Sequence, residues 1–386
     1  MLPYNAFDLD DLEPLGELIG DARIVAIGEN NHHIREFGEM RDRILRFLVE
    51  RRGFTVLGFE SGFAEGRLVD EWLHGGPGDV EDIGRHGFTF TLGESAEVRE
   101  MLTWLRAQGG VRFAGLDVPG SGGSPLPALA EVRKYLEHKA PEAVSFVDEA
   151  IARTEPYSAA SNALAPARYN SLEQPQRDAA MAALARLVAH LESLAPVCPD
   201  SAVALHHARG ALRVDTYLRE LSDLMAGRAP VLQSSSRDTY MAQTVRLLGD
   251  ARIVLMVHNG HLQRVPVRLM PTAVTPSMGT HLAAELGDDY FALALTAGTG
   301  TTTGVRPDQD ERLGFRVYEQ PLDDPAPRSA EHALSGRGPS LVNLRALRST
   351  AGPTSIRHAH LYSEVDVVSA FDALIYLPEM HSIAAR

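Results

Sequence analysis

One short stretch of the chain, IVAIGENNHHIREFGEMR, places four side chains that can exchange protons close together: Glu29, His32, His33 and Glu36. Histidine titrates near neutral pH and can take a proton from water, while a neighbouring carboxylate orients the imidazole and stabilises its charge. The pattern therefore predicts an active-site corner. The simpler alternative at this corner is a surface loop with solvated charges.

These groups need rigid elements to hold them, and the hydrophobic pattern predicts a strand, a glycine turn and a helix. The apolar run at residues 23–28 is typical of a buried strand, and the spacing after it is helical until Gly53, which favours a left-handed helix end. Three further predicted strands also end at ionisable groups, and they cover residues 55–59 before Glu60, 111–116 before Asp117 and 253–257 before His258. Ligands of open parallel sheets bind at the carboxyl ends of the strands, so we expect these groups to meet in one cleft.

The composition changes between residues 126 and 228, which are rich in Ala, Leu and Glu and have helical periodicity without a convincing strand. We expect three to five helices here, forming an all-helical insertion that caps the cleft. A bundle that only adds core is the alternative. The predicted fold class is α/β, with a mostly parallel central sheet flanked by helices. Residues 1–125 and 229–386 form the core, and residues 290–296 and 370–377 are further strand candidates.

Composition excludes several classes of protein. The net charge is −14 and the Lys and Arg residues are scattered, which disfavours nucleic-acid binding. No apolar run approaches the roughly 20 residues that span a bilayer, and the acidic start of the chain lacks signal-peptide features. Cys198 is the one cysteine, so an internal disulfide is excluded. We expect a cytoplasmic protein with a small-molecule substrate; the oligomeric state is not encoded in any recognisable pattern.

Common catalytic motifs are absent from the sequence. There is no G-x-S-x-G nucleophile elbow and no Walker A loop, and Cys198 lies between prolines in the helical region. Histidines and carboxylates remain. His32, beside Glu29 and Glu60, suits a general base. Arg41 stays charged and can bind a carboxylate or stabilise an oxyanion.

The pair His258-x-x-His261 leaves two interpretations open. It can supply a second acid or base, or it can join His32 and Glu29 as nitrogen and oxygen ligands of zinc or another divalent ion. The spacing alone does not decide, because His-x-x-His is common by chance. We expect no cofactor other than such a metal.

The chain resembles the erythromycin esterases, hydrolases that open macrolide lactones. The resemblance covers most of the chain and rests on separated blocks in a shared order: Gly28-Glu29-Asn30-Asn31-His32, Glu36-Phe37 and Arg41; Phe59-Glu60 and Gly62-Phe63-Ala64; Asp117-Val118-Pro119; Arg237-Asp238; and His258-Asn259-Gly260-His261. It implies an α/β core with a helical insertion over a deep cleft. It also implies hydrolysis by an activated water, without an acyl-enzyme and without a metal.

The resemblance also suggests roles for individual residues. His32 is similar to the general base of the family, with Glu60 as its carboxylate partner. The remaining catalytic positions are Glu29, Arg41, His258 and His261. Substrate contacts are expected from His33, Asn30, Asp117 and Phe63. His33 departs from the family pattern, in which an apolar or aromatic residue is expected, and this departure concerns substrate identity more than fold.

Three functions are compatible with these residues. The first is an ester hydrolase that opens a macrolide or related cyclic ester, as in antibiotic resistance. The second is a biosynthetic enzyme that uses the same groups for cyclisation, dehydration or acyl transfer on a polyketide-like substrate, because an acid–base site does not fix the reaction. The third is a protein that only binds a small hydrophobic ligand, which seldom needs so many ionisable groups in one cleft.

Overall fold

A nine-stranded sheet forms the centre of the computed structural model, which describes residues 5–6, 8–228, 234–270 and 273–383. The strand order is β1-β10-β13-β8-β2-β5-β3-β4, and β9 pairs with β8. The strands are β1 (Asn5–Ala6), β2 (Ile24–Ile27), β3 (Val56–Gly62), β4 (Arg112–Asp117), β5 (Ile253–Met256), β8 (Tyr290–Pro307), β9 (Phe315–Pro321), β10 (Ser340–Asn343) and β13 (Ala373–Met380). Residues 1–4 lie outside the described part, and so does residue 229, at which the sequence predicts that the core resumes after the helical insertion.

The strands from β13 to β4 run parallel, whereas β1, β10 and β9 are antiparallel to their neighbours. Every residue of β2, β3 and β5 is buried. This matches their nearly continuous apolar sequences, because helices cover both faces of a parallel sheet. The predicted α/β class with a mostly parallel sheet is confirmed.

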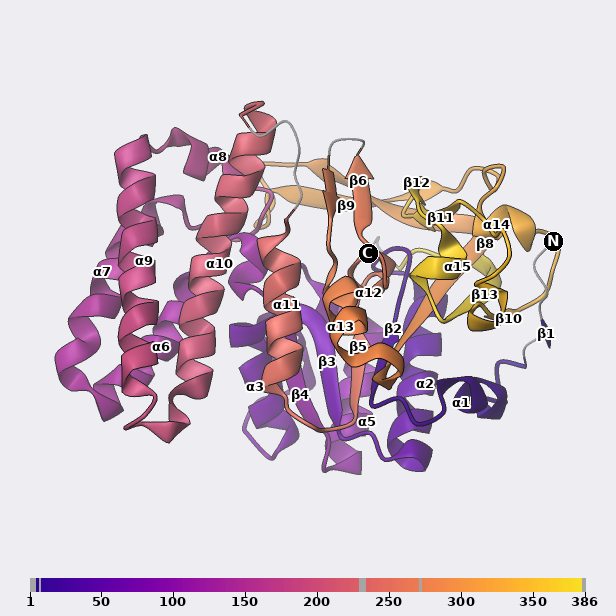
Figure 1. The fold of residues 1–386 in the computed structure, drawn as a ribbon, viewed down its shortest axis with the longest axis horizontal. Helices are drawn as coiled ribbons and strands as arrows, with labels where there is room; N and C mark the ends of the chain where they lie inside the picture. The colour runs from indigo at the N-terminus through magenta and orange to yellow at the C-terminus, as the bar shows by residue number, and fades with distance from the viewer. Residues whose placement is uncertain (1–4, 7, 229–233, 271–272, 384–386) are drawn as a thin grey trace.

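Helices pack on both faces of the sheet (Figure 1). One face is covered by α1 (Glu13–Ile19), α2 (Arg35–Arg52), α3 (Phe63–Leu73), α4 (Val80–His86) and α5 (Ala96–Gln108). The other face is covered by α11 (Ser236–Leu247), α12 (Asn259–Leu262), α13 (Met278–Leu286), α14 (Ala330–Ala333) and α15 (Val367–Ala370). Gly53 ends α2 with φ +69, as the sequence predicts.

A separate group of helices stands beside the β4 edge of the sheet, at the left of Figure 1. Described residues 126–228 contain five α-helices with short 3-10 turns and no strand, in agreement with the predicted helical content. The helices are α6 (Leu126–Lys139), α7 (Val144–Thr154), α8 (Ala165–Ser171), α9 (Gln174–Leu194) and α10 (Ala202–Met225). They have an apolar core of their own, and α10 also packs on α11 of the sheet layer.

Several strands differ from the sequence-based prediction. The strand predicted at residues 290–296 is only the first part of β8, which continues as a Thr- and Gly-rich ribbon paired with β9. The strand predicted at 370–377 starts later, because Ala370 ends α15. Two hairpins were not predicted: β6 (Val267–Met270) with β7 (Ala273–Thr275), and β11 (Ser355–His358) with β12 (Leu361–Glu364).

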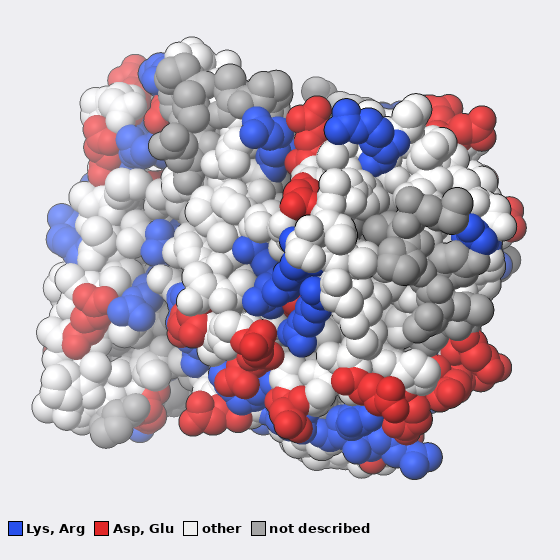
Figure 2. Space-filling view, turned by 45° about the vertical axis from the view of Figure 1, so that its right-hand side comes forward, with Lys and Arg blue, Asp and Glu red and all other residues white. Residues whose placement is uncertain are grey.

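The surface agrees with the charge pattern of the sequence. On the face shown in Figure 2, Lys and Arg side chains form a short band near the centre, with Asp and Glu side chains above and below it. No helix among the described residues is long and apolar enough to cross a membrane.

Candidate active site

The candidate catalytic residues lie at the carboxyl edge of the sheet. Met256, the last residue of β5, pairs with Ile27 of β2 on one side and with Phe59 of β3 on the other. The polar residues that follow these strands therefore emerge at the same level, as the sequence predicts.

Glu29, His32 and Arg41 form one hydrogen-bonded group. His32 Nδ1 lies 2.9 Å from Glu29 Oε1, and Arg41 Nη1 lies 2.5 Å from the same oxygen. Burial alone would raise the pKa of Glu29, but the charge of Arg41 and the hydrogen bond from His32 lower it to about 2. An ionised Glu29 accepts the Nδ1–H of His32, which leaves Nε2 directed at Glu60, with Oε1 3.8 Å away.

The pKa of His32 reflects these neighbours. Burial lowers this pKa, but the hydrogen bond to Glu29 and the charge of Glu60 raise it by more than burial lowers it. The net pKa therefore lies above the ordinary value of histidine. The imidazole therefore holds a proton more strongly than an ordinary histidine does.

The long strand β8 holds the loop that carries His32. Asn31 Nδ2 donates to Thr302 Oγ1 and to the carbonyl of Thr303, both at 2.8 Å. Thr303 Oγ1 in turn donates to the carbonyl of His32 at 3.0 Å. The part of β8 that the sequence did not predict is thus the part that fixes the backbone of this loop.

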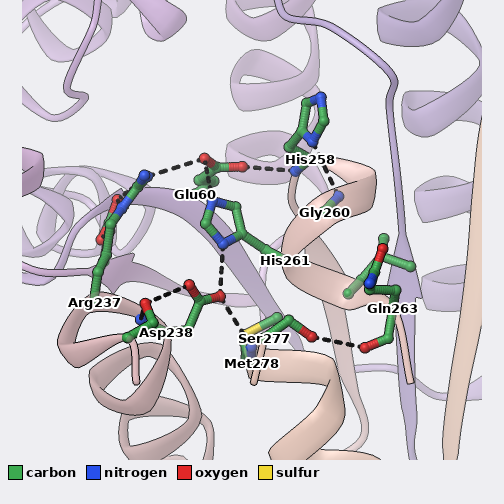
Figure 3. A network of polar contacts seen from close by, with 12 residues as sticks. Glu60, Arg237, Asp238, His258, Gly260, His261, Gln263, Ser277 and Met278 are labelled. Atoms are coloured by element: carbon green, nitrogen blue, oxygen red, sulfur yellow. Dashed lines mark hydrogen bonds and ion pairs between the residues drawn. The ribbon is translucent and has the colours of Figure 1, made fainter. Parts of the chain in front are cut away.

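Glu60 lies at the centre of a second network (Figure 3). Its Oε1 is 3.1 Å from Arg237 Nη2 and 3.3 Å from His261 Nε2, and its Oε2 accepts the backbone N–H of His258 at 2.6 Å. Burial would raise the pKa of Glu60, but His261, His32 and Arg237 lower it well below the ordinary value. Glu60 is therefore a carboxylate at neutral pH.

His261 is held between two carboxylates. Its Nδ1 lies 2.7 Å from Asp238 Oδ1, opposite the contact of Nε2 with Glu60. Burial lowers the pKa of His261, but the charges of Asp238 and Glu60 raise it to about 10. His261 is consequently an imidazolium at neutral pH, with both ring protons directed at carboxylates.

His258 is neutral, and both of its ring nitrogens are occupied. Nε2 donates to the carbonyl of Asn30 at 2.8 Å, and Nδ1 accepts the N–H of Gly260 at 3.0 Å, which caps α12. Burial and the nearby His358 and His32 hold its pKa well below the ordinary value. This histidine therefore positions the start of α12 and has no free nitrogen for proton transfer.

Arg237 is anchored by Asp117 at the end of β4. Its Nε lies 2.9 Å from both carboxylate oxygens of Asp117, and its Nη2 lies 2.6 Å from Oδ2. Asp117 is fully buried, and its carboxylate contacts the Arg237 guanidinium. The guanidinium links this carboxylate to Glu60 and completes a chain of alternating charges from β4 to His261.

A cavity of about 350 Å³ opens over these networks. His32, Glu60 and His261 face it from the sheet edge, and α10 supplies one wall. The remaining lining residues come from several elements: Asn31, Tyr217, Glu220, Leu221, Ser234, Ser235, Arg237, Asp238, His258, Gly260, Val267, Thr275 and His358. The volume is within the range of small-molecule sites.

The four expected substrate contacts do not line this cavity. Phe63 packs on the rings of His206 and His207, with centroids 4.7 and 4.9 Å apart. His33, with φ +59, borders a different groove on the far side of the loop. Asn30 and Asp117 are fully buried behind the lining. Glu29 and Arg41, expected at the catalytic centre, do not line this cavity either; Glu29 contacts the ring of His32, and Arg41 contacts Glu29.

Other lining residues were not predicted as site residues. Arg237 and Asp238 belong to one of the sequence blocks shared with the erythromycin esterases, but the sequence suggests no role for them. The fold places them in the first turn of α11, where Arg237 contacts Glu60. Tyr217 and Glu220 belong to a helix whose apolar pattern carries no sign of a site. His358 lies at the end of the unpredicted strand β11, and only a His-x-His sequence marks it.

The alternative of a metal site at His258, His261, His32 and Glu29 can be compared with the contacts of these side chains. Both ring nitrogens of His258 and of His261 already have hydrogen-bond partners. Within the described ranges, no group of three or more His, Cys, Asp or Glu side chains is placed to hold a metal.

The fold and the site together define an α/β enzyme with buried histidines and carboxylates at the carboxyl edge of its sheet. The family model for erythromycin esterase matches residues 49–380. The chain therefore belongs to the erythromycin esterase family and is an esterase.

Curated relatives and a solved structure agree with this assignment. Erythromycin esterase type II of Escherichia coli is 31% identical, over 95% of this chain and 92% of the relative. Type I from the same organism is 28% identical, over 97% and 95%. A histidine-to-asparagine variant of the erythromycin esterase EreC, in its open conformation, has a TM-score of 0.87 and 25% identity over the full length of both chains.

Proposed function

We propose that this esterase opens a macrolide lactone or a related cyclic ester, with His32 as the general base. The observation that carries the proposal is the state of His32: its Nδ1 is held by Glu29, and its Nε2 faces the cavity without a hydrogen bond from the described residues. The named activity of the curated relatives supports the choice of substrate class.

The reaction starts with a water molecule between His32 Nε2 and the ester carbonyl. His32 takes one proton from this water while the water oxygen bonds to the carbonyl carbon. Glu29 stabilises the imidazolium that forms. The tetrahedral oxyanion then collapses and the ring C–O bond breaks. The imidazolium returns the proton to the leaving alkoxide, so the product is a ring-opened hydroxy acid.

The second network supplies the electrostatics of the reaction. Glu60 lies 3.8 Å from His32 Nε2 and can orient the attacking water. The positive charges of His261 and Arg237 stand next to Glu60 and favour the developing oxyanion, since fixed charges in a buried site need little reorganisation.

The helical insertion is proposed to act as a lid for a large substrate. Helix α10 contributes Tyr217, Glu220 and Leu221 to one wall of the cavity. A shift of this helix would change the width of the cavity without disturbing the sheet edge that holds His32.

Mass spectrometry of a 14-membered macrolide incubated with the chelator-treated enzyme tests the proposal. We expect a product heavier by one water. The absence of any mass change with a folded protein would contradict it and favour a biosynthetic reaction at the same site. Saturable binding without product, unaffected by replacement of His32, would favour a binding protein.

A further inference from the structure

A fourth imidazole faces the cavity, and it comes from a different part of the chain. His358 is the last residue of β11 and lines the same cavity as His32 and His261. Its ring centroid lies 4.3 Å from that of His258, with the planes tilted by 58°. The rings of His258 and His358 are thus in contact in a tilted arrangement.

His358 differs from the other histidines of the cavity in its hydrogen bonding. His258 and His261 use both ring nitrogens, and His32 uses Nδ1. In the part of the chain that the structure describes, neither ring nitrogen of His358 has a hydrogen-bond partner. Both nitrogens are available to a molecule in the cavity.

The backbone on one side of His358 is fixed to the catalytic loop. Ala359 donates its N–H to the carbonyl of Asn30 at 2.8 Å, and this carbonyl also accepts the Nε2–H of His258 at 2.8 Å. Ala359 adopts φ +55, a left-handed conformation that is uncommon for residues other than glycine. The turn therefore retains a strained residue at the point where it contacts the loop.

The backbone on the other side is fixed by a buried polar chain. The N–H of Arg357 donates to Glu331 Oε1 at 3.0 Å, and this oxygen also accepts the hydroxyl of Thr296. Thr296 Oγ1 accepts Asn30 Nδ2 at 3.2 Å. Glu331, Thr296 and Asn30 are fully buried. A closed circuit of hydrogen bonds thus ties both neighbours of His358 to Asn30.

The environment of His358 favours its uncharged form. His358 is exposed where it borders the cavity, but its partial removal from water and the nearby charges of His261 and His32 lower its pKa. A neutral imidazole offers one N–H donor and one acceptor nitrogen, which suit hydroxyl and carbonyl groups better than ions.

We propose that His358 is a substrate-contacting residue that hydrogen bonds to a hydroxyl or carbonyl oxygen of a neutral, oxygen-rich substrate. The circuit through Asn30 and Glu331 fixes the backbone on both sides of His358, from which its ring reaches the cavity. The inference rests on the proposed hydrolysis of a cyclic ester and adds a specificity contact to it.

Steady-state kinetics of three variants with a 14-membered macrolide test the inference. For His358→Ala we expect KM to rise by about three- to tenfold, the usual worth of a neutral hydrogen bond, with a smaller change in kcat. His358→Gln, which keeps a donor and an acceptor, should recover most of the loss. His360→Ala, in the same turn but outside the cavity lining, should behave as the wild type. Thermal unfolding of each variant checks that the hairpin is intact.

The outcomes separate this inference from the proposed function. An active wild type with an unchanged KM for His358→Ala would overturn the contact and leave the hydrolase proposal standing. Equal losses for the Ala and Gln variants would also overturn it, because they indicate a packing role on His258. A folded wild type that does not open the macrolide would overturn the proposed function and, with it, the contact assigned to His358.

Discussion

Three histidines of the site have similar surroundings but different proton states, because their partners differ. Two carboxylates keep His261 protonated, whereas a carbonyl acceptor and an amide donor keep His258 neutral. His32 has one carboxylate partner and one nitrogen facing the cavity. For this reason His32 is the one of the three that we propose as the general base.

Replacement of His32 tests this assignment. We expect His32→Gln to lower kcat by about 10²- to 10⁴-fold, the range for loss of a general base, while macrolide binding persists. Binding by calorimetry and turnover by mass spectrometry measure the two effects. His138→Gln, an exposed histidine on α6, is the matched control. A His32→Gln enzyme within a factor of two or so of the wild type would remove the general base from the mechanism.

The pH dependence of activity follows from the contacts of His32. His32 must be neutral to accept a proton, so activity is lost as the pH falls through its pKa, which lies above that of an ordinary histidine. In Glu29→Gln the hydrogen-bonding carboxylate and its charge are absent, so this pKa falls and the acid limb of kcat/KM moves to lower pH. The exposed Glu50→Gln serves as control. A limb that stays in place or moves to higher pH contradicts the pairing.

At the scale of elements, strand ends and loops position the site. The sequence predicts the strands that precede Glu29, Glu60, Asp117 and His258, because buried parallel strands are continuous apolar runs. It does not predict the extension of β8 or the β11–β12 hairpin, whose Thr, Gly and charged residues are stabilised by pairing with distant segments.

The sequence predicts the positions of some of these side chains and not of others. His32, Glu60 and His261 follow recognisable apolar runs and are brought together as expected. Phe63 is an aromatic residue after a strand, but α10 covers it with His206, and the sequence contains no signal for that packing. The position of His358 likewise depends on a tertiary contact between its neighbour Ala359 and Asn30.

The junction between β2 and α12 requires a glycine. A Cβ on Gly28 would lie 1.9 Å from Asn259 Oδ1. Asn259 cannot move freely, because its side chain hydrogen bonds to both the carbonyl and the N–H of Leu295 in β8. We expect Gly28→Ala to lower the free energy of unfolding by about 1–3 kcal/mol, as for other overpacked sites, and to reduce activity by displacing α12.

Urea unfolding and kcat/KM measure these two effects. Gly338→Ala is the matched control, because nothing lies within 4 Å of the position of its added Cβ. Equal stability of the two variants would contradict the tight packing of Gly28 against α12.

At the scale of the whole molecule, residues of the sheet edge and of helix α10 both line the cavity, and one apolar cluster joins the sheet layer to the helices of residues 126–228. The sheet carries the charged groups, and the helical insertion reaches the cavity through α10. Composition predicts the helices of the insertion, but the side from which they approach the cleft depends on packing between α10 and α11, which no local pattern encodes.

Hydrogen exchange tests the lid proposal. Addition of a macrolide to the His32→Gln variant is expected to slow amide exchange in residues 215–225 of α10, because a lid that closes over a ligand opens less often. Exchange in α7, which has no residue in the cavity lining, should stay unchanged. Equal exchange in α10 with and without bound ligand would contradict a lid.

Removal of divalent metal tests the alternative of a metal site at His258 and His261. The ring nitrogens of His258 and His261 are occupied by protein partners, so we expect dialysis against a chelator to leave kcat/KM unchanged. Loss of activity that returns on addition of zinc would contradict this expectation and require a rearranged site.

A single-turnover reaction in heavy-oxygen water, with enzyme in excess over a macrolide, tests direct attack by water at the His32 site. We expect a ring-opened acid that carries one heavy oxygen from its first turnover, and formation of this acid at least about a hundredfold slower in His32→Gln. A first-turnover product without the label would indicate a covalent intermediate on Glu29 or Glu60. That result, or no product from the folded wild type, would contradict direct attack by water at the His32 site.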